Sequence, residues 1–197
     1  MVQFRVRKAL LALGAAALMT VTGPAFAQPA PATGGDATSV TPSASAAGFW
    51  SCSVPPGYTY TNTRSTTRCS TTGLRTQYYV QRPSGGLWAC TVPSGFIYDN
   101  IQSTTGCSVS GLRSKYRLRE PGDNLWACSV PSGYTYDRVQ STTRCSTAGL
   151  RTTYRVREPR TGLWACTVPS GFTYTATQTT TSCSATGLRT KYRLRAY

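Results

Sequence analysis

Eight cysteines are the residues of this chain whose chemistry depends most directly on their spacing. They form pairs 17 residues apart, and each pair recurs 38 residues after the pair before it. Thiols in such an arrangement can oxidise to disulfides or hold a metal ion. Structural zinc sites use cysteines separated by about two to four residues, or mixtures of cysteine and histidine. The chain has no histidine and no such short spacing, so we expect disulfides, and neither a metal nor a cofactor.

The repeat favours pairing of the two cysteines inside each unit. The rival pairing joins neighbouring units, for example Cys69 to Cys90, and it would leave Cys52 and Cys183 without partners. Closing a loop of this length stabilises a small module by about 3 kcal/mol in the chain-entropy description. The expected disulfides are Cys52–Cys69, Cys90–Cys107, Cys128–Cys145 and Cys166–Cys183.

Basic residues form the second chemical pattern. After Gly-Leu near the end of each unit, every second residue is basic in the second and fourth units, and in the third unit only Thr153 interrupts the series. Alternation on a strand places such residues on one outward face. Successive members would lie about 6.6 to 6.8 Å apart. The planar guanidinium group suits two-point contact with phosphate, sulfate or carboxylate. The candidate polyanion-binding residues are Arg75 in the first unit, Arg113, Lys115, Arg117 and Arg119 in the second, Arg151, Arg155 and Arg157 in the third, and Arg189, Lys191, Arg193 and Arg195 in the fourth.

A structural explanation for these cations stands beside the functional one. A strand with one exposed face must carry polar residues there, and Lys or Arg at a sheet edge prevents aggregation. Acidic residues are nearly absent from these strands, although a face of mixed charge would be equally soluble. We therefore favour contact with a polyanion, and such contact should weaken steeply with salt.

The aromatic residues and the catalytic possibilities are weaker signals. Each unit has one tryptophan and tyrosine pairs such as Tyr58 and Tyr60, which could stack on sugars but more simply form the core of a small module. Acidic residues form no repeated pair, since Asp99 and Asp137 occur in only two of the units. Without histidine for general-base chemistry and with oxidised cysteines, we expect a protein that is not an enzyme.

The elements that must position these residues are short strands. In the second unit we expect strands around residues 88–92, 96–98, 103–105 and 112–119, with a Pro-Ser-Gly turn at residues 93–95. Trp, Cys and Val of the first strand should share one face. Leu112, Ser114, Tyr116 and Leu118 should face inward along the last strand. The core of each unit should consist of the tryptophan, the disulfide, a valine, aromatic residues and a leucine.

The fold class expected is all-β, with four tandem disulfide-linked modules that stack or close into a compact array. Trp50, Trp88, Trp126 and Trp164 mark the period of 38 residues. The short connectors favour contact between neighbouring modules. The four repeats are expected at residues 49–86, 87–124, 125–162 and 163–197.

The N-terminal part predicts export. Residues 1–27 have a basic start, an apolar stretch and Ala25-Phe26-Ala27, which is the pattern of a signal peptide cleaved near Ala27. Residues 28–48 are rich in Ala, Pro, Thr and Ser, and we expect a disordered linker there. The whole chain has a net charge of +15, and no segment is long and apolar enough for a transmembrane helix. The expected location is outside the cell, in the periplasm or at the cell surface.

These features favour a secreted, non-enzymatic, multivalent protein that binds an anionic polysaccharide or another polyanion. Candidate partners are a cell-surface glycan, lipopolysaccharide or extracellular nucleic acid. The alternative is a structural component of a surface, matrix or adhesin that self-associates through its repeats. A cationic toxin-like protein is the third hypothesis, and the absence of an amphipathic helical pattern disfavours it.

Overall fold

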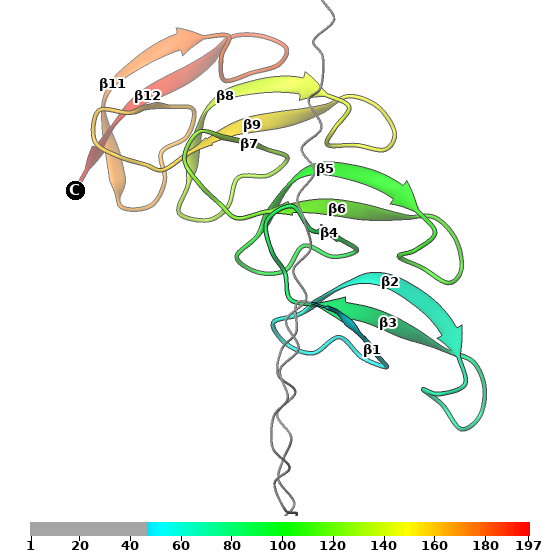
Figure 1. Ribbon diagram of the computed structural model, residues 1–197. Helices are drawn as coiled ribbons and strands as arrows, with labels where there is room; N and C mark the ends of the chain where they lie inside the picture. The colour runs from blue at the N-terminus through cyan, green and yellow to red at the C-terminus, as the bar shows by residue number, and fades with distance from the viewer. Residues whose placement is uncertain (1–46) are drawn as a thin grey trace, which may run out of the picture. The chain divides into compact units, whose positions relative to one another are not determined.

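The structure, a computed structural model, describes residues 47–197, and all of the regular structure in that range is β-strand. Figure 1 shows four modules that follow one another along the chain, each with a three-stranded sheet of its own. The predicted all-β class and the four tandem modules are confirmed. The predicted signal peptide (1–27) and nearly all of the predicted linker (28–48) lie outside the described residues.

Each module has one short strand followed by two long ones. The strands are β1 (Phe49–Ser51), β2 (Thr59–Thr66) and β3 (Arg75–Gln81) in module 1; β4 (Trp88–Ala89), β5 (Ile97–Thr104) and β6 (Arg113–Arg119) in module 2; β7 (Leu125–Ala127), β8 (Thr135–Thr142) and β9 (Arg151–Arg157) in module 3; and β10 (Trp164–Ala165), β11 (Phe172–Thr180) and β12 (Arg189–Ala196) in module 4.

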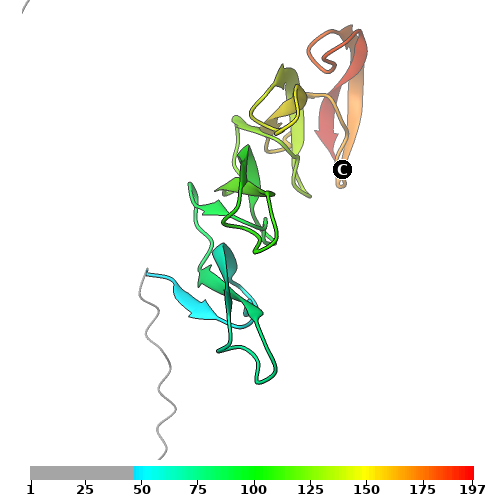
Figure 2. The ribbon, with the colours of Figure 1, turned by 90° about the vertical axis from the view of Figure 1, so that its right-hand side faces the viewer.

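The last strand of each module lies in the centre of its sheet, antiparallel to both neighbours, as in the order β1-β3-β2. The two long strands form a hairpin, and the hairpin loop carries the second cysteine (Figures 1 and 2). Thr, Tyr, Val and Ile are common in the long strands because β-branched and aromatic side chains pack well on a pleated surface. The segments expected at residues 96–98 and 103–105 belong to one continuous strand, β5.

A tight turn joins the first two strands of each module. In module 2, the amide of Phe96 donates to the carbonyl of Pro93 at 3.2 Å, and Gly95 has a φ of 83°. This hydrogen bond makes Pro93 the first residue of the turn and Gly95 the third. A type II turn favours glycine at the third position, because only glycine adopts this positive φ without strain. The repeated Val-Pro-x-Gly segment therefore fixes where the short strand ends and the hairpin begins.

Alternation along the central strands divides each sheet into two faces. The tyrosine face carries Tyr78, Tyr116, Tyr154 and Tyr192, followed two residues later by Val80, Leu118, Val156 and Leu194. Those four aliphatic side chains are almost completely buried, and Ala89, Ala127 and Ala165, which lie opposite the tyrosines, are fully buried. The arginine face carries the other alternating set, which begins at Arg75, Arg113, Arg151 and Arg189. The core of each module thus lies on the tyrosine face.

Two predictions about the inward residues are wrong. Leu112 is 69% exposed because the strand begins only at Arg113 and Leu112 belongs to the hairpin loop. Trp88 pairs across the sheet with Arg117, which places it half-buried on the arginine face. The strand ends at Ala89, so the expected alternation of Trp88, Cys90 and Val92 on one face does not occur.

The four disulfides confirm the pairing inside each unit. Every bridge joins cysteines 17 residues apart with a Cα–Cα distance of 5.4 Å. Each one ties the end of the short first strand to the hairpin loop, two segments that the sheet itself does not join. Such bridges are consistent with an extracellular or secreted protein.

Neighbouring modules contact each other through a repeated set of hydrogen bonds. The amides of Cys90, Cys128 and Cys166 donate to the carbonyls of Tyr60, Tyr98 and Tyr136 in the module before, at 2.7 to 2.8 Å. We call the side of a module that carries the cysteine amide its leading edge. The side that carries the tyrosine carbonyl is its trailing edge. The trailing edge comprises Thr59, Tyr60 and Thr63 in module 1 and their equivalents 38, 76 and 114 residues later; the leading edge comprises Cys52, Ser53 and Arg68 and their equivalents.

Two further contacts complete each junction. The Thr59 and Thr91 hydroxyls lie 2.8 Å apart, and those of Thr135 and Thr167 lie 2.9 Å apart. At the middle junction Ile97, 2% exposed, packs in an apolar cluster with Ala127 and Val156 instead. Lower on the edge, the amides of Ile101 and Val139 donate at 2.8 Å to the carbonyls of Arg144 and Ser182. The modules are therefore joined by packed contacts as well as by connectors.

Candidate functional site

The arginine face shows how the predicted cations are placed. In module 2, Arg113, Lys115, Arg117 and Arg119 alternate along β6 as expected. The strand beside them, β5, contains a β-bulge between Tyr98 and Asn100. The extra residue in this bulge is Asp99, and a bulge re-aims the side chain of its extra residue. Asp99 thereby reaches two of the four cations.

Asp99 forms a clamp on both arginines. Arg117 donates two hydrogen bonds to its carboxylate at 2.7 and 2.9 Å, and Arg119 donates a third at 2.6 Å. Burial disfavours the charged carboxylate, but the hydrogen bonds from the two arginines outweigh burial, so the pKa of Asp99 is lowered. Arg117 and Arg119 are thus half-buried ion-pair partners rather than unpaired outward cations.

Module 3 repeats this clamp and extends it. Asp137 accepts two hydrogen bonds from Arg155, at 2.6 and 2.8 Å, and one from Arg157, and its pKa is also lowered despite opposing burial. Arg157 additionally contacts Asp123 at 2.8 Å. Hydrogen bonds from Arg157, with smaller contributions from the Glu158 amide and Arg160, lower the pKa of Asp123 to about 2.

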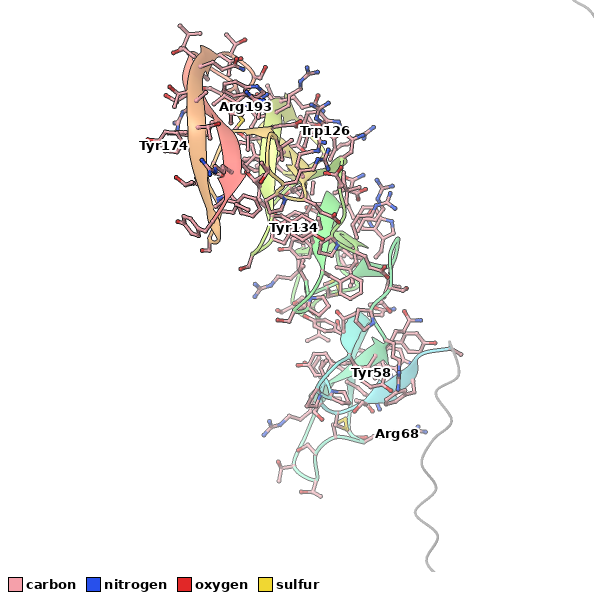
Figure 3. All side chains as sticks on the ribbon, turned by 90° about the vertical axis from the view of Figure 1, so that its left-hand side faces the viewer. Tyr58, Arg68, Trp126, Tyr134, Tyr174 and Arg193 are labelled. Carbon is pink, nitrogen blue, oxygen red and sulfur yellow. A yellow bond between two sulfur atoms is a disulfide. The ribbon has the colours of Figure 1, made fainter. Side chains whose placement is uncertain are left out.

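Modules 1 and 4 lack the clamp because threonine replaces the bulge aspartate at Thr61 and Thr175. In module 1, Tyr79 and Gln81 replace the two arginines, and Arg64 lies over the ring of Trp50 at 4.1 Å. In module 4, Arg193 and Arg195 remain, and both are exposed. Figure 3 shows Arg193 on β12 in this last module.

A second feature, which the sequence did not predict as a site, recurs on the other side of the modules. An open groove runs along each of the three junctions within residues 47–197, with volumes of about 530, 500 and 290 Å³ in chain order. The tyrosine face of one module forms one wall, and the hairpin loop of the next forms the other. The first groove is lined by Tyr60 and Tyr78 together with Arg113, the second by Tyr98 and Tyr116 together with Arg151, and the third by Tyr136 and Tyr154 together with Arg189.

Each groove contains a tyrosine pair in an edge-to-face arrangement. The ring centroids lie 5.0 to 5.1 Å apart in the three pairs. Burial is the main cause that raises the pKa values of Tyr60, Tyr98 and Tyr136, with the partner tyrosine adding to the rise. These phenols therefore stay neutral and keep their hydroxyl hydrogens for donation. Each tyrosine pair thus belongs both to the core face of its module and to the wall of a groove.

The groove arginine differs from the clamped ones. Arg113, Arg151 and Arg189 are exposed, and none of them forms an ion pair within the described part of the chain. Each lies at the start of its central strand, next to the hairpin loop. Hydroxyl groups surround it, including Ser108 and Ser110 in the first groove and Ser184 and Thr186 in the third. The arrangement offers one cation, two phenols and several hydroxyls to a single ligand group.

The predicted cation set is therefore divided by the structure into three environments. Arg117, Arg119, Arg155 and Arg157 are clamped by aspartates. Lys115 and Lys191 are half-buried, and burial lowers their pKa values. The remaining members carry no ion pair in the range 47–197, and they are Arg75, Arg113, Arg151, Arg189, Arg193 and Arg195.

Sequence reasoning missed the clamps and the grooves for different reasons. Asp99 and Asp137 lie at the same repeat position, but the bulge that turns them toward the arginines depends on pairing between strands. The grooves involve tyrosines from one module and an arginine from the next, and only the contact between modules brings them together. The available signal was the recurrence, every 38 residues, of two tyrosines that are 18 residues apart, as in Tyr60 and Tyr78.

Other site types receive no support from the described residues. Within 47–197, no helix could span a membrane, and no group of three or more His, Cys, Asp and Glu side chains is arranged to hold a metal ion. Comparisons of the chain with known protein families, with curated protein sequences and with solved structures found no match. The geometry of the molecule alone must indicate its function.

Proposed function

We propose that the protein is a secreted, non-enzymatic binding protein that holds an anionic polysaccharide in its inter-module grooves. The observation that carries the proposal is the recurrence of Arg113, Arg151 and Arg189, each exposed and without an ion pair in the described chain, at one position of three similar grooves. In each groove this guanidinium group lies among hydroxyl groups, where it can bind an anionic group of a ligand.

Each groove suits one acidic sugar. The guanidinium group can bind a carboxylate or sulfate through two parallel hydrogen bonds. The phenols and the Ser and Thr hydroxyls can bond sugar hydroxyls, and the tyrosine rings offer apolar surface to a sugar ring. Such a contact is weak in isolation, but grooves on one chain bind a polymer at high effective concentration. We infer that affinity depends on engagement of several grooves at once.

A polysaccharide fits this arrangement better than nucleic acid does. Nucleic-acid binding draws most of its affinity from many cations that neutralise successive phosphates. Here the row of cations on the central strands is interrupted, since aspartates clamp four of its arginines. The grooves offer instead one unclamped arginine each, among hydroxyl groups.

The test compares two variants of equal charge. One replaces the groove arginines with glutamine (Arg113→Gln, Arg151→Gln and Arg189→Gln). The control replaces three exposed arginines that line none of the grooves (Arg68→Gln, Arg138→Gln and Arg144→Gln). Titration with fluorescent heparin at low salt should show an affinity loss of at least about tenfold for the groove variant and about twofold or less for the control.

Equal losses in the two variants would show that only net charge matters and would overturn the groove as the site. Three further probes define the ligand: a carboxylated polysaccharide, single-stranded DNA and neutral dextran. Preference for DNA over both acidic polysaccharides would replace the polysaccharide with nucleic acid. If neutral dextran bound as tightly as the acidic polysaccharides, an electrostatic mechanism would be excluded.

Export is a separate part of the proposal. The basic and apolar pattern of residues 1–27 and the four disulfides support it. Protein recovered outside the cytoplasm should begin at Gln28, as N-terminal sequencing would show. Recovery of an uncleaved chain with reduced cysteines in the cytoplasm would contradict export.

A further inference from the structure

Within the described residues 47–197, no module covers the trailing edge of module 4. Thr59 and Thr135, which occupy the same position in modules 1 and 3, are 0% exposed because the next module covers them. Their equivalent Thr173 is exposed, and Tyr174 is 51% exposed. Figure 3 shows Tyr174 projecting from β11. The last module thus presents to solvent a surface that is an interior contact in the modules before it.

Among residues 47–197, nothing covers the leading edge of module 1. Cys90 and Cys166 are 7% and 8% exposed at the corresponding contacts, whereas Cys52 is exposed. Phe49 is 46% exposed, while its equivalents Leu87, Leu125 and Leu163 are half-buried. Because both edges are exposed, they do not cover each other within one chain.

We propose that the trailing edge of module 4 binds the leading edge of module 1 in a second copy of this chain, so that molecules join head to tail. The two edges carry, in the same register, the groups that meet at the junctions between modules inside the chain. This proposal is independent of polysaccharide binding.

Three contacts define the expected junction. The amide of Cys52 would donate to the carbonyl of Tyr174, as Cys166 does to Tyr136. Ser53 would meet Thr173, as Thr167 meets Thr135. The amide of Thr177 would donate to the carbonyl of Arg68, as Val139 does to Ser182. All three pairs consist of one donor and one acceptor, or of two hydroxyls, so each of these groups would gain a hydrogen-bond partner.

The junction would also complete a fourth groove. Arg75 occupies in module 1 the position of the groove arginines, and Tyr174 and Tyr192 form a pair with centroids 5.2 Å apart in module 4. Within one chain these residues belong to opposite ends of the array. Head-to-tail joining would place them as Arg113 is placed beside Tyr60 and Tyr78.

An interface between two different surfaces of one molecule gives open chains of increasing length, or rings of several copies where the rotation between copies closes. Inside the protein a short connector holds the two sides of this contact at an effective concentration on the order of millimolar. Because the contact forms at that concentration inside the chain, separate molecules should associate as their own concentration approaches it. We expect association in the range from about ten micromolar to the low millimolar.

The first test measures mass against concentration by sedimentation equilibrium over that range, on the purified oxidised protein. The trailing-edge variant carries Thr173→Lys and Thr177→Lys, both at exposed positions. The matched control carries Ser94→Lys and Ser132→Lys, in exposed turns of modules 2 and 3. We expect the average mass of the wild type and of the control to rise beyond that of a dimer, and the trailing-edge variant to stay monomeric.

A wild type that stays monomeric throughout, or a trailing-edge variant that assembles like the control, would overturn the proposal. The second test identifies the register. A photoreactive residue at position 173, in a mixture of isotopically labelled and unlabelled protein, should cross-link to the segment 49–54 of another molecule. Cross-links to module 4 of the other molecule would indicate a two-fold dimer and would refute head-to-tail joining.

Discussion

At the scale of single residues, Asp99 and Asp137 determine which arginines of the central strands are accessible to a ligand. Each aspartate contacts two arginines through three hydrogen bonds and so removes them from the set of accessible cations. Partly buried ion pairs of this geometry contribute more than exposed ones, since solvent screens them less. The exposed cations that form no ion pair in the described chain include the groove arginines, Arg193 and Arg195 of module 4, and arginines outside the grooves such as Arg68, Arg138 and Arg144.

Replacing Asp137 with asparagine should release Arg155 and Arg157. We expect the free energy of unfolding to fall by about 1 to 3 kcal/mol, because partly buried groups lose their charged partner. Heparin binding should strengthen, because two additional cations become accessible. Chemical denaturation and salt elution from heparin measure the two effects.

The control is Glu158→Gln, which removes the same charge from an exposed side chain that forms no ion pair in the described chain. It should strengthen heparin binding less and leave stability within about 0.5 kcal/mol. Equal effects of the two substitutions would show that the clamp has no special role.

The lowered pKa values of Asp99 and Asp137 set the pH dependence of stability. A carboxyl group whose pKa is lower in the folded state stabilises the fold above its ordinary pKa and loses that contribution as the pH falls through its folded value. The pKa of Asp123 is about 2, so its contribution to stability is lost only at still lower pH. We expect stability to decline from about pH 4 to pH 2.

The double variant Asp99→Asn and Asp137→Asn should be less stable at neutral pH and show a shallower decline below pH 4. Urea unfolding at a series of pH values measures both slopes. Parallel curves for the variant and the wild type would mean that other groups cause the acid sensitivity.

At the scale of elements, the hairpin is the unit that builds both core and groove. Its central strand buries Leu118 or the equivalent valine or leucine on one face and carries the arginines on the other. Its loop reaches the preceding module and closes the groove. The second strand of each module carries the trailing edge, whose groups bind the next module.

Thr135 and Thr173 occupy the same trailing-edge position in modules 3 and 4, and they give a matched test of the contact between modules. Thr135 is 0% exposed and its hydroxyl lies 2.9 Å from both the hydroxyl and the carbonyl oxygen of Thr167. Thr135→Ala should lower the free energy of unfolding by about 1 to 2 kcal/mol. Thr173→Ala, at the same position of the last module, should change it by less than about 0.5 kcal/mol at concentrations where the protein is monomeric. A similar loss at the two positions, measured by thermal or urea unfolding, would contradict the assignment of Thr135 to the junction.

The period of 38 residues predicted the modules, the disulfides and the alternation along β6, because these features are local in the sequence. The exposure of Leu112 was not predictable from alternation, since the strand starts one residue later than the pattern suggests. The placement of Trp88 on the arginine face depends on its pairing with Arg117, a contact 29 residues away in the chain. Clamps and grooves likewise require knowledge of which segments meet.

At the scale of the whole molecule, copying one module gives three similar grooves within residues 47–197 rather than one specialised site. Under the proposed function, affinity would come from the number of contacts, and the bound polymer would have to span more than one module. The uncovered leading and trailing edges allow the same principle to continue from molecule to molecule. Assembly through these edges would add one further groove at each junction between molecules.

The measurement that tests the central claim most directly is the affinity for long-chain heparin as groove arginines are removed one at a time, from the wild type to Arg151→Gln, to Arg113→Gln with Arg151→Gln, and to the triple variant. It is made at protein concentrations too low for assembly. We predict a stepwise loss of roughly threefold or more at each step and a salt dependence that becomes shallower with each arginine removed. A full loss at the first step, or equal affinity and salt slope in all four proteins, would contradict a multivalent site made of repeated grooves.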